Sequence, residues 1–102
     1  MTQELTRAIA EAYRTTEDEM FMQSKKRRLV DARSMLAYVL VKKFGYTLEE
    51  TADIVQRDRS TVFNMLNNMS NLLIYDEPTK AIYEKLQTNF LNNLDYVFSI
   101  NM

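Results

Sequence analysis

The residues best suited to chemistry in this 102-residue chain lie in one short segment, Arg57-Asp58-Arg59-Ser60-Thr61. Its two guanidinium groups can each donate a bidentate pair of hydrogen bonds to guanine O6 and N7, and its carboxylate can accept from cytosine N4. The two hydroxyls can serve either a base or a phosphate. Asp58 is equally suited to be a simple helix N-cap, and one carboxylate can do both. The segment therefore carries the donors and acceptors needed to contact base-pair edges.

A helix-turn-helix would position these side chains. Thr47-Leu48-Glu49-Glu50 has the spacing of a capping box and predicts a short helix that ends at about Val55. Gln56-Arg57-Asp58 is a polar break, and a second helix follows it. In such a motif the second helix enters the major groove by its amino end. We expect three apolar residues to anchor that helix to the core: Val62, Phe63 and Leu66. Its four asparagines could touch DNA, but we expect them to face solvent: Asn64, Asn67, Asn68 and Asn71.

Basic residues are concentrated in the middle of the chain. The whole chain has 13 basic and 14 acidic residues, a net charge of −1. Residues 24–64 hold nine basic and five acidic residues, a net charge of +4, whereas residues 1–23 total −3 and residues 65–102 total −2. A basic centre between acidic ends is typical of a surface that binds an anionic partner. A solvent-exposed helix face is an equally good interpretation of charge alone.

The composition disfavours most other chemistry. Without His or Cys the chain lacks the usual general base, the usual zinc ligands and any disulfide, and its single Gly excludes a glycine-rich phosphate loop. We therefore expect no enzyme activity, no catalytic residue, no cofactor, no metal and no small-molecule substrate. No apolar run approaches the roughly 18 residues that a membrane span needs. We expect a soluble, cytoplasmic protein without a membrane partner.

The fold expected is all-α, a single domain of residues 1–102 with five or six helices. One Gly and one Pro leave little material for the tight turns of a strand protein. Residues 1–23 would form the leading helices, residues 24–75 the basic segment and the helix-turn-helix core, and residues 76–102 the C-terminal helix. Apolar residues recur at three- and four-residue steps in all three parts, as one face of a helix requires.

Several residues mark the expected helix ends. Thr2 can cap a first helix that ends near Arg14, and Thr16 with Glu19 has capping-box spacing for a short turn through Met22. The helix that follows the basic segment should close at Gly45, in the left-handed position after a helix end. Asp76-Glu77-Pro78 should open the last helix. The apolar tail, Leu91 to Met102, could pack back on the domain or against a second copy.

Taken together, these motifs resemble the C-terminal DNA-binding domain of the bacterial replication initiator DnaA. The likeness rests on Ser24-Lys25-Lys26-Arg27-Arg28, Ala32-Arg33-Ser34-Met35 with Tyr38, the segment 47–52, and Arg57 to Val62. In the family the last of these is Arg-Asp-His-Thr-Thr-Val. The likeness covers roughly residues 5 to 75 and implies a Trp-repressor-like helical fold around a helix-turn-helix.

The resemblance also implies roles for single residues. The basic segment would place Arg27 or Arg28 in the minor groove, and Arg33 would hold a phosphate. The amino end of the helix at Thr47 and Leu48 would meet the DNA backbone. The DNA-binding residues expected are Lys25, Lys26, Arg27, Arg28, Arg33, Thr47, Leu48, Arg57, Asp58, Arg59, Ser60 and Thr61.

Three departures from the family pattern are visible. Arg59 replaces its His, Ser60 replaces its first Thr, and Gln56 stands where the family has a glycine pair. The first two change the groups offered to the bases, so the preferred DNA site should differ from the DnaA box. The third predicts a tighter or reshaped turn between the two helices.

The function expected is sequence-selective binding of double-stranded DNA, in control of replication initiation or transcription, by a nucleoid-associated protein of bacterial or phage origin. The alternative is a protein-interaction module that keeps the DnaA-like fold and binds a replication or transcription partner. A homodimer or a replication-protein contact through the C-terminal helix is compatible with either.

Overall fold

A computed structural model describes residues 2–88 of the chain, and all the regular elements within that range are helices. They are α1 (Thr2–Ala12), α2 (Glu17–Met20), α3 (Arg27–Lys42), α4 (Leu48–Val55), α5 (Arg59–Tyr75) and α6 (Glu77–Leu86). The expected all-α fold is therefore confirmed. No helix in this part of the chain is long and apolar enough to cross a membrane.

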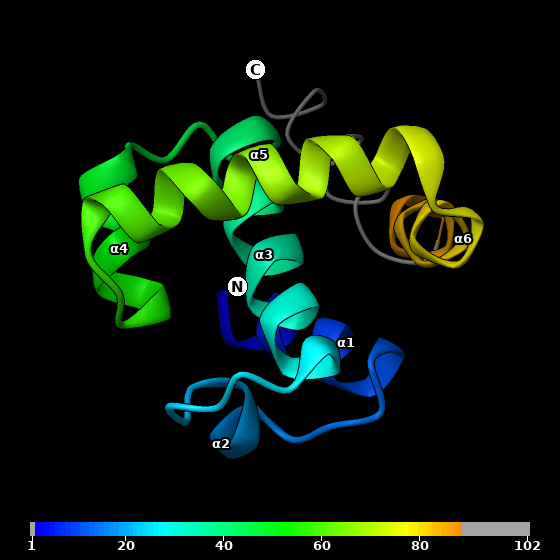
Figure 1. Cartoon of the computed structure of the whole chain (residues 1–102), viewed down its shortest axis with the longest axis horizontal. Helices are drawn as coiled ribbons and strands as arrows, with labels where there is room; N and C mark the ends of the chain where they lie inside the picture. The colour runs from blue at the N-terminus through cyan, green and yellow to red at the C-terminus, as the bar shows by residue number, and fades with distance from the viewer. Residues whose placement is uncertain (1, 89–102) are drawn as a thin grey trace.

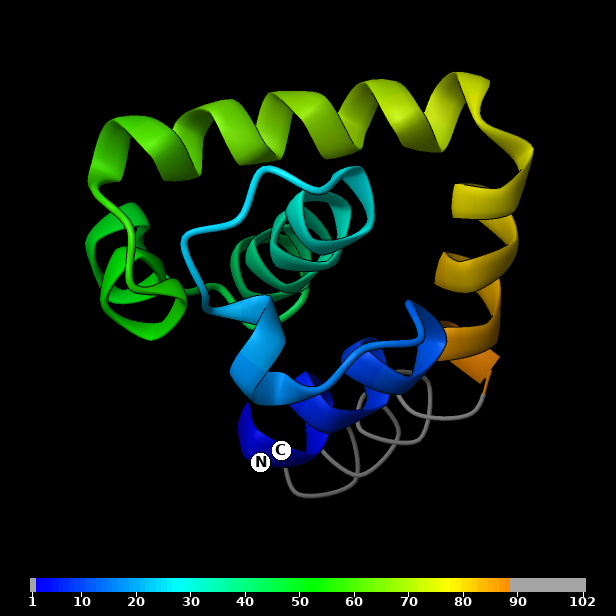
Figure 2. The same cartoon turned by 60° about the horizontal axis from the view of Figure 1, so that its bottom comes forward.

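Helix α3 lies at the centre of the fold. Figure 1 shows it running crosswise behind α5, and Figure 2 shows it surrounded by the other helices, with α5 along one side, α4 and α6 at the two ends of α5, and α1 and α2 opposite. Its fully buried residues come from most of its circumference: Ala32, Met35, Leu36, Ala37, Val39 and Leu40. A helix that buries apolar side chains over more than half of its circumference must be covered by neighbours on several sides. Among the described helices, α3 and α5 pack against each other most extensively.

The predicted capping residues open four of the helices. In each case a side-chain oxygen accepts from the backbone N–H three residues on, which satisfies an amide that has no partner inside the helix. The donor-acceptor pairs are Glu19 to Thr16 at 3.1 Å, Glu50 to Thr47 at 3.0 Å, Thr61 to Asp58 at 2.7 Å and Thr79 to Asp76 at 3.1 Å. The capping box of α4 is complete, because the N–H of Thr47 also donates to the Glu50 carboxylate at 2.9 Å.

Two left-handed residues end the helices before and within the helix-turn-helix. Gly45 has φ +72°, and the N–H of Tyr46 donates to the carbonyl of Leu40 at 3.0 Å, which satisfies one of the last carbonyls of α3. Gln56 has φ 59° and ψ 44° at the end of α4, where the family resemblance implied glycine. A residue with a Cβ in this region costs about 1 kcal/mol. The turn is thus made by a strained glutamine.

Some bounds differ from the expected ones. Thr2 is the first residue of α1 and not its cap, α1 ends at Ala12 instead of near Arg14, and α2 ends at Met20 instead of Met22. Arg14, at φ 57°, is the residue that turns the chain after α1. The expected packing of the tail, Leu91 to Met102, lies outside the described residues.

The expected anchoring of α5 is wrong for Phe63. Val62 is fully buried and Leu66 packs against the core, whereas Phe63 is 54% exposed. Neighbouring residues of an α-helix are about 100° apart, so Val62 and Phe63 cannot both face α3. Met65 and Met69 continue the buried face that Val62 begins.

Three of the capping carboxylates give the fold a dependence on pH. The backbone N–H groups of Thr61 and Thr47 lower the pKa of Asp58 and Glu50, and the hydroxyl and then the N–H of Thr79 lower the pKa of Asp76. A lowered folded-state pKa stabilises the protein above the ordinary carboxyl pKa, and that stabilisation is lost as the pH falls through the lowered value.

We therefore expect the Tm to fall on acidification from pH 5 to pH 3, and to fall less in the double variant Asp58→Asn, Asp76→Asn. Asparagine caps as well as aspartate but does not titrate, so the Tm at pH 7 should be nearly unchanged. Thermal melts followed by circular dichroism measure this, with Asp53→Asn on the exposed face of α4 as the control. Equal acid-induced losses in the double variant and the wild type would contradict the explanation.

Candidate nucleic-acid interface

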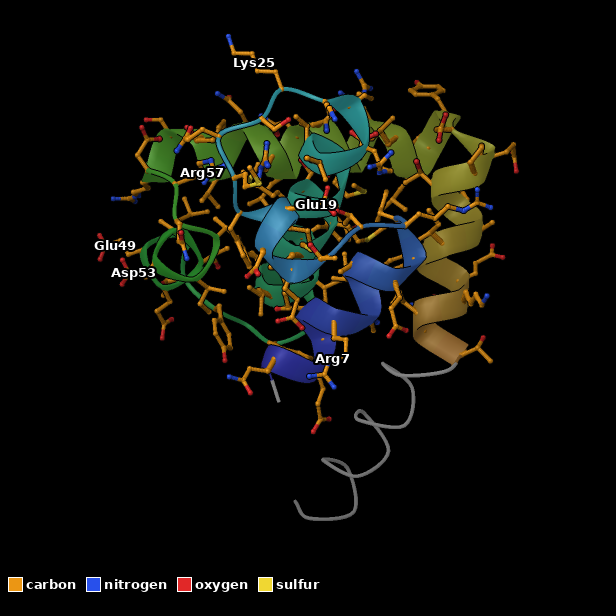
Figure 3. The ribbon with its side chains drawn as sticks, turned by 90° about the horizontal axis from the view of Figure 1, so that it is seen from below. Arg7, Glu19, Lys25, Glu49, Asp53 and Arg57 are labelled. Carbon is orange, nitrogen blue, oxygen red and sulfur yellow. The ribbon has the colours of Figure 1, made fainter. Side chains whose placement is uncertain are left out.

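The basic segment, Ser24 to Arg28, joins α2 to α3 and passes beside the start of α5. Lys25, Lys26, Arg27 and Arg28 are all exposed. In Figure 3 Lys25 projects from the loop away from the body of the protein, and Arg57 lies where the loop passes the junction of α4 and α5. The structure thus brings the basic segment and the Arg57 to Thr61 segment together, although they are separated in sequence.

Arg33 fixes the path of the chain that leads into the basic segment. From α3 its Nη1 donates to the carbonyls of Met20 at 2.6 Å and Met22 at 3.2 Å, and its Nη2 donates to the carbonyl of Ser24 at 2.8 Å. The residue is 5% exposed. Burial, and then the nearby charge of Arg57, lower the pKa of its guanidinium. Both Nη groups of Arg33 therefore donate to backbone carbonyls, and its buried Nε has no partner among the described residues. The side chain has little exposed surface left for the phosphate that the family resemblance implied.

Arg57 approaches the same chain from the other side. Its Nη2 donates to the carbonyl of Met22 at 2.9 Å, and its Nη1 donates to the carbonyl of Gln56 at 2.8 Å. The oxygen of Met22 thus accepts from two arginines, one on α3 and one in the turn of the helix-turn-helix. We call this carbonyl and the guanidinium groups of Arg33 and Arg57 the Met22 clasp. Within residues 2–88 no carboxylate lies within ion-pair distance of either guanidinium.

An open cleft of about 470 Å³ separates the basic segment from α5. Cations line it from both sides, because Lys25 and Arg27 contribute from the segment while Arg33 and Arg57 contribute from the clasp. Thr61 and Asn64 line it from α5, and its lining includes no carboxylate. Such a cleft has a positive potential that attracts an anionic ligand.

The start of α3 adds to this potential. Lys26 stands at the N-cap position without a capping hydrogen bond, and the first turn has no acidic residue. The positive end of the helix dipole therefore coincides with a run of cations, an arrangement that is unfavourable unless an anion is bound. Only Arg27 of the run is paired, with the Asp31 carboxylate at 3.2 Å in the same helix. Lys25, Lys26 and Arg28 make no ion pair with a described residue.

The start of α5 presents a smaller set of groups than the sequence suggested. Asp58 is the N-cap, as predicted, and one of its two oxygens accepts from Thr61. Arg59 and Ser60 are exposed, and Arg59 lies 3.6 Å from the Glu49 carboxylate in a pair that is open to solvent on both sides. Such a pair is weak and separates readily. Arg59 is thus the cation of this segment that is free to leave the protein surface.

The start of α4 is less suited to a phosphate than expected. The N–H groups of Thr47 and Glu50 are both used in the capping box, and Leu48 is half-buried. Glu49 and Glu50 place two exposed carboxylates in the first turn. Figure 3 shows Glu49 and Asp53 on the outer side of α4. This end of the helix therefore repels anions more than it attracts them.

The comparison with known families agrees with the geometry. Residues 2–68 match the family described as the bacterial DnaA protein helix-turn-helix, and the chain belongs to this family. Its membership confirms the resemblance and indicates DNA binding through a helix-turn-helix, since the family is a DNA-binding domain and not a catalytic one. No curated protein and no solved structure matches the chain.

Sequence reasoning missed three features of the interface. The backbone carbonyl of Met22 has no signature in sequence, and the exposure of Phe63 runs against its apolar type. Asn68 was expected in solvent, but it is half-buried and its Nδ2 donates to the Ser34 hydroxyl at 3.3 Å, which joins α5 to α3. Its small polar partner at Ser34 is the one sequence feature that could have indicated this contact.

Arg33→Lys should lower the free energy of unfolding by about 2 kcal/mol, because the three donors of an ammonium group lie on one nitrogen and cannot reach all the carbonyls that the two Nη atoms of the guanidinium bind, so the carbonyl of Met20 or Ser24 loses its donor. Urea denaturation followed by circular dichroism measures the change. Arg28→Lys, at an exposed position of the same helix, is the control and should change stability by less than about 0.5 kcal/mol. Equal stabilities of the two variants would show that the guanidinium fork is not needed.

Proposed function

We propose that this protein binds double-stranded DNA with sequence selectivity, placing the amino end of α5 in the major groove and the basic segment in the neighbouring minor groove. The observation that carries the proposal is the Met22 clasp. It ties the basic segment to both α3 and the turn before α5, so the two sets of contacts belong to one rigid surface. A surface of this kind can meet a duplex without paying the entropy of ordering a free loop.

In the minor groove we assign the contacts to Lys25, Lys26 and Arg28. These three are exposed and unpaired among the described residues, whereas Arg27 is held by Asp31. Of the two residues expected to enter the minor groove, Arg28 is therefore the better placed. The cleft behind the segment, lined by cations, would face the phosphates between the two grooves.

In the major groove we assign guanine recognition to Arg59, whose fork can donate to O6 and N7 once it leaves Glu49. Ser60 and Thr61 would contact bases or phosphates, and the oxygen of Asp58 that is not used by the cap could accept from cytosine N4. Arg33 and Arg57 act as positioning residues in this proposal, because their hydrogen bonds hold the backbone of the interface.

We further propose that the protein acts inside the cell on DNA, in control of replication initiation or of transcription. What supports this is membership of the bacterial DnaA helix-turn-helix family together with the exposed cations of the interface. The preferred site should differ from the family's own, because Arg59 offers a guanidinium fork where the family has an imidazole.

The test is selection of bound duplexes from a random pool, followed by titration of the selected duplex and a scrambled one at several salt concentrations. We expect a shared motif that contains a guanine, a log-log salt slope of about −0.9 per phosphate contact, and at least about tenfold loss of preference for that guanine in Arg59→Ala. A variant that keeps the guanine preference would contradict the assignment of Arg59.

Glu49→Gln is the companion variant with the opposite expectation. Removal of the carboxylate frees Arg59 and lowers the repulsion of phosphates, so binding should strengthen about twofold to fivefold. Glu84→Gln, exposed on α6, is the matched control and should change nothing. Weak and equal binding of every duplex would overturn the proposal and favour the protein-interaction module.

A further inference from the structure

Phe63 lies among the groups that α5 would present to the bases. At about 100° per residue, its side chain points within about 60° of Ser60 and about 40° of Asn67 around the helix axis. All three residues are exposed, and Phe63 is 54% exposed. The opposite face of α5 is the buried one, with Val62, Met65 and Met69 against the core.

An exposed aromatic residue is not in itself unusual on a protein surface. Its place on α5 makes it informative, because it follows Arg59 by one helical turn on the face proposed to enter the major groove. The groove edges of the bases are hydrogen-bond donors and acceptors with one apolar exception, the C5-methyl group of thymine. A phenyl ring packed against any other base edge would displace the water that is hydrogen-bonded to that edge, and it could not replace those hydrogen bonds.

We infer that Phe63 is a specificity-determining residue that selects thymine by packing its ring on the C5-methyl group, one helical turn along α5 from the contact made by Arg59. The inference rests on the proposed function, since it needs α5 in the major groove. It adds an apolar requirement to a site that Arg59, Ser60 and Thr61 would recognise by hydrogen bonds. The DNA site should then hold a guanine and a thymine at a fixed spacing.

The exposure of Phe63 makes the inference testable without loss of the fold. Phe63→Ala removes a side chain that covers little of the core, so the variant should stay folded. Tyr75→Ala is the matched control, because Tyr75 is an 81% exposed aromatic residue at the other end of the same helix. A circular dichroism melt of both variants verifies that each remains folded before binding is measured.

The experiment replaces each thymine of the selected duplex, one at a time, by deoxyuridine, which keeps every hydrogen-bonding group and lacks only the methyl. At one position we expect the wild type to lose about threefold to fivefold in affinity, the effect of one buried methyl group. Phe63→Ala should bind the two duplexes equally at that position, and Tyr75→Ala should lose affinity as the wild type does.

The possible results separate this inference from the proposed function. If the wild type selects a duplex, but every deoxyuridine substitution has the same effect in the wild type and in Phe63→Ala, the assignment of Phe63 is wrong while the proposed function stands. If the wild type does not distinguish the selected from the scrambled duplex, both are wrong. Suppression of the methyl effect at one thymine by Phe63→Ala alone supports both.

Discussion

The interface depends on one backbone carbonyl, that of Met22, and on the two arginines that donate to it. A carbonyl oxygen has two lone pairs, so it can accept from both guanidinium groups at once. The arrangement has a cost, because Arg33 is buried and its charge lies near that of Arg57, and both effects lower its pKa. The carbonyls of Met20 and Ser24 offset that cost by accepting further hydrogen bonds from Arg33. The segment that carries the exposed cations is consequently fixed to the centre of the fold.

The basic residues of the interface divide into two groups with different roles. Arg33 and Arg57 turn inward and hold the backbone, whereas Lys25, Lys26, Arg28 and Arg59 turn outward. The outward group stands at the positive ends of two helices, α3 and α5. The start of α5 has the Asp58 carboxylate as its N-cap, whereas α3 has no acidic residue at its N-cap or in its first turn. Carboxylates in the first turn of α3 would make the fold more stable, because they interact favourably with the positive end of the helix dipole. Phosphates of a bound duplex would supply the missing negative charge, so DNA binding should also stabilise the fold.

The sequence predicted the helices well because capping is local chemistry. Each capping side chain accepts a hydrogen bond from the residue three positions on, as at Thr16, Thr47, Asp58 and Asp76. Gly45 adopts the left-handed conformation that the end of α3 requires. In each case a short stretch of sequence contains the whole interaction. The position of the helix-turn-helix followed from these caps. The family resemblance followed from the motifs around them.

The roles of single side chains were harder to predict, because they depend on contacts distant in sequence. The hydrogen bond from Arg57 to Met22 spans 35 positions, and no local pattern shows that this arginine turns inward while Arg59 turns outward. Phe63 was misplaced for a different reason. Two adjacent apolar residues compete for one helix face, and only the packing of α5 on α3 decides that Val62 occupies it.

The central claim is that the basic segment and α5 lie in adjacent grooves of one duplex. Because the chain has no cysteine, single variants such as Gln23→Cys and Asn67→Cys can carry an iron chelate that cleaves DNA nearby, at exposed positions to which no base or phosphate contact is assigned. On the selected duplex we predict two cleavage centres about 5 base pairs apart, which is half a helical turn. For the probe at position 23, the cleaved positions on the two strands should be offset in the way typical of cleavage from the minor groove. The probe at position 67 should not give this offset. Coincident centres, or uniform cleavage from position 23, would contradict the account.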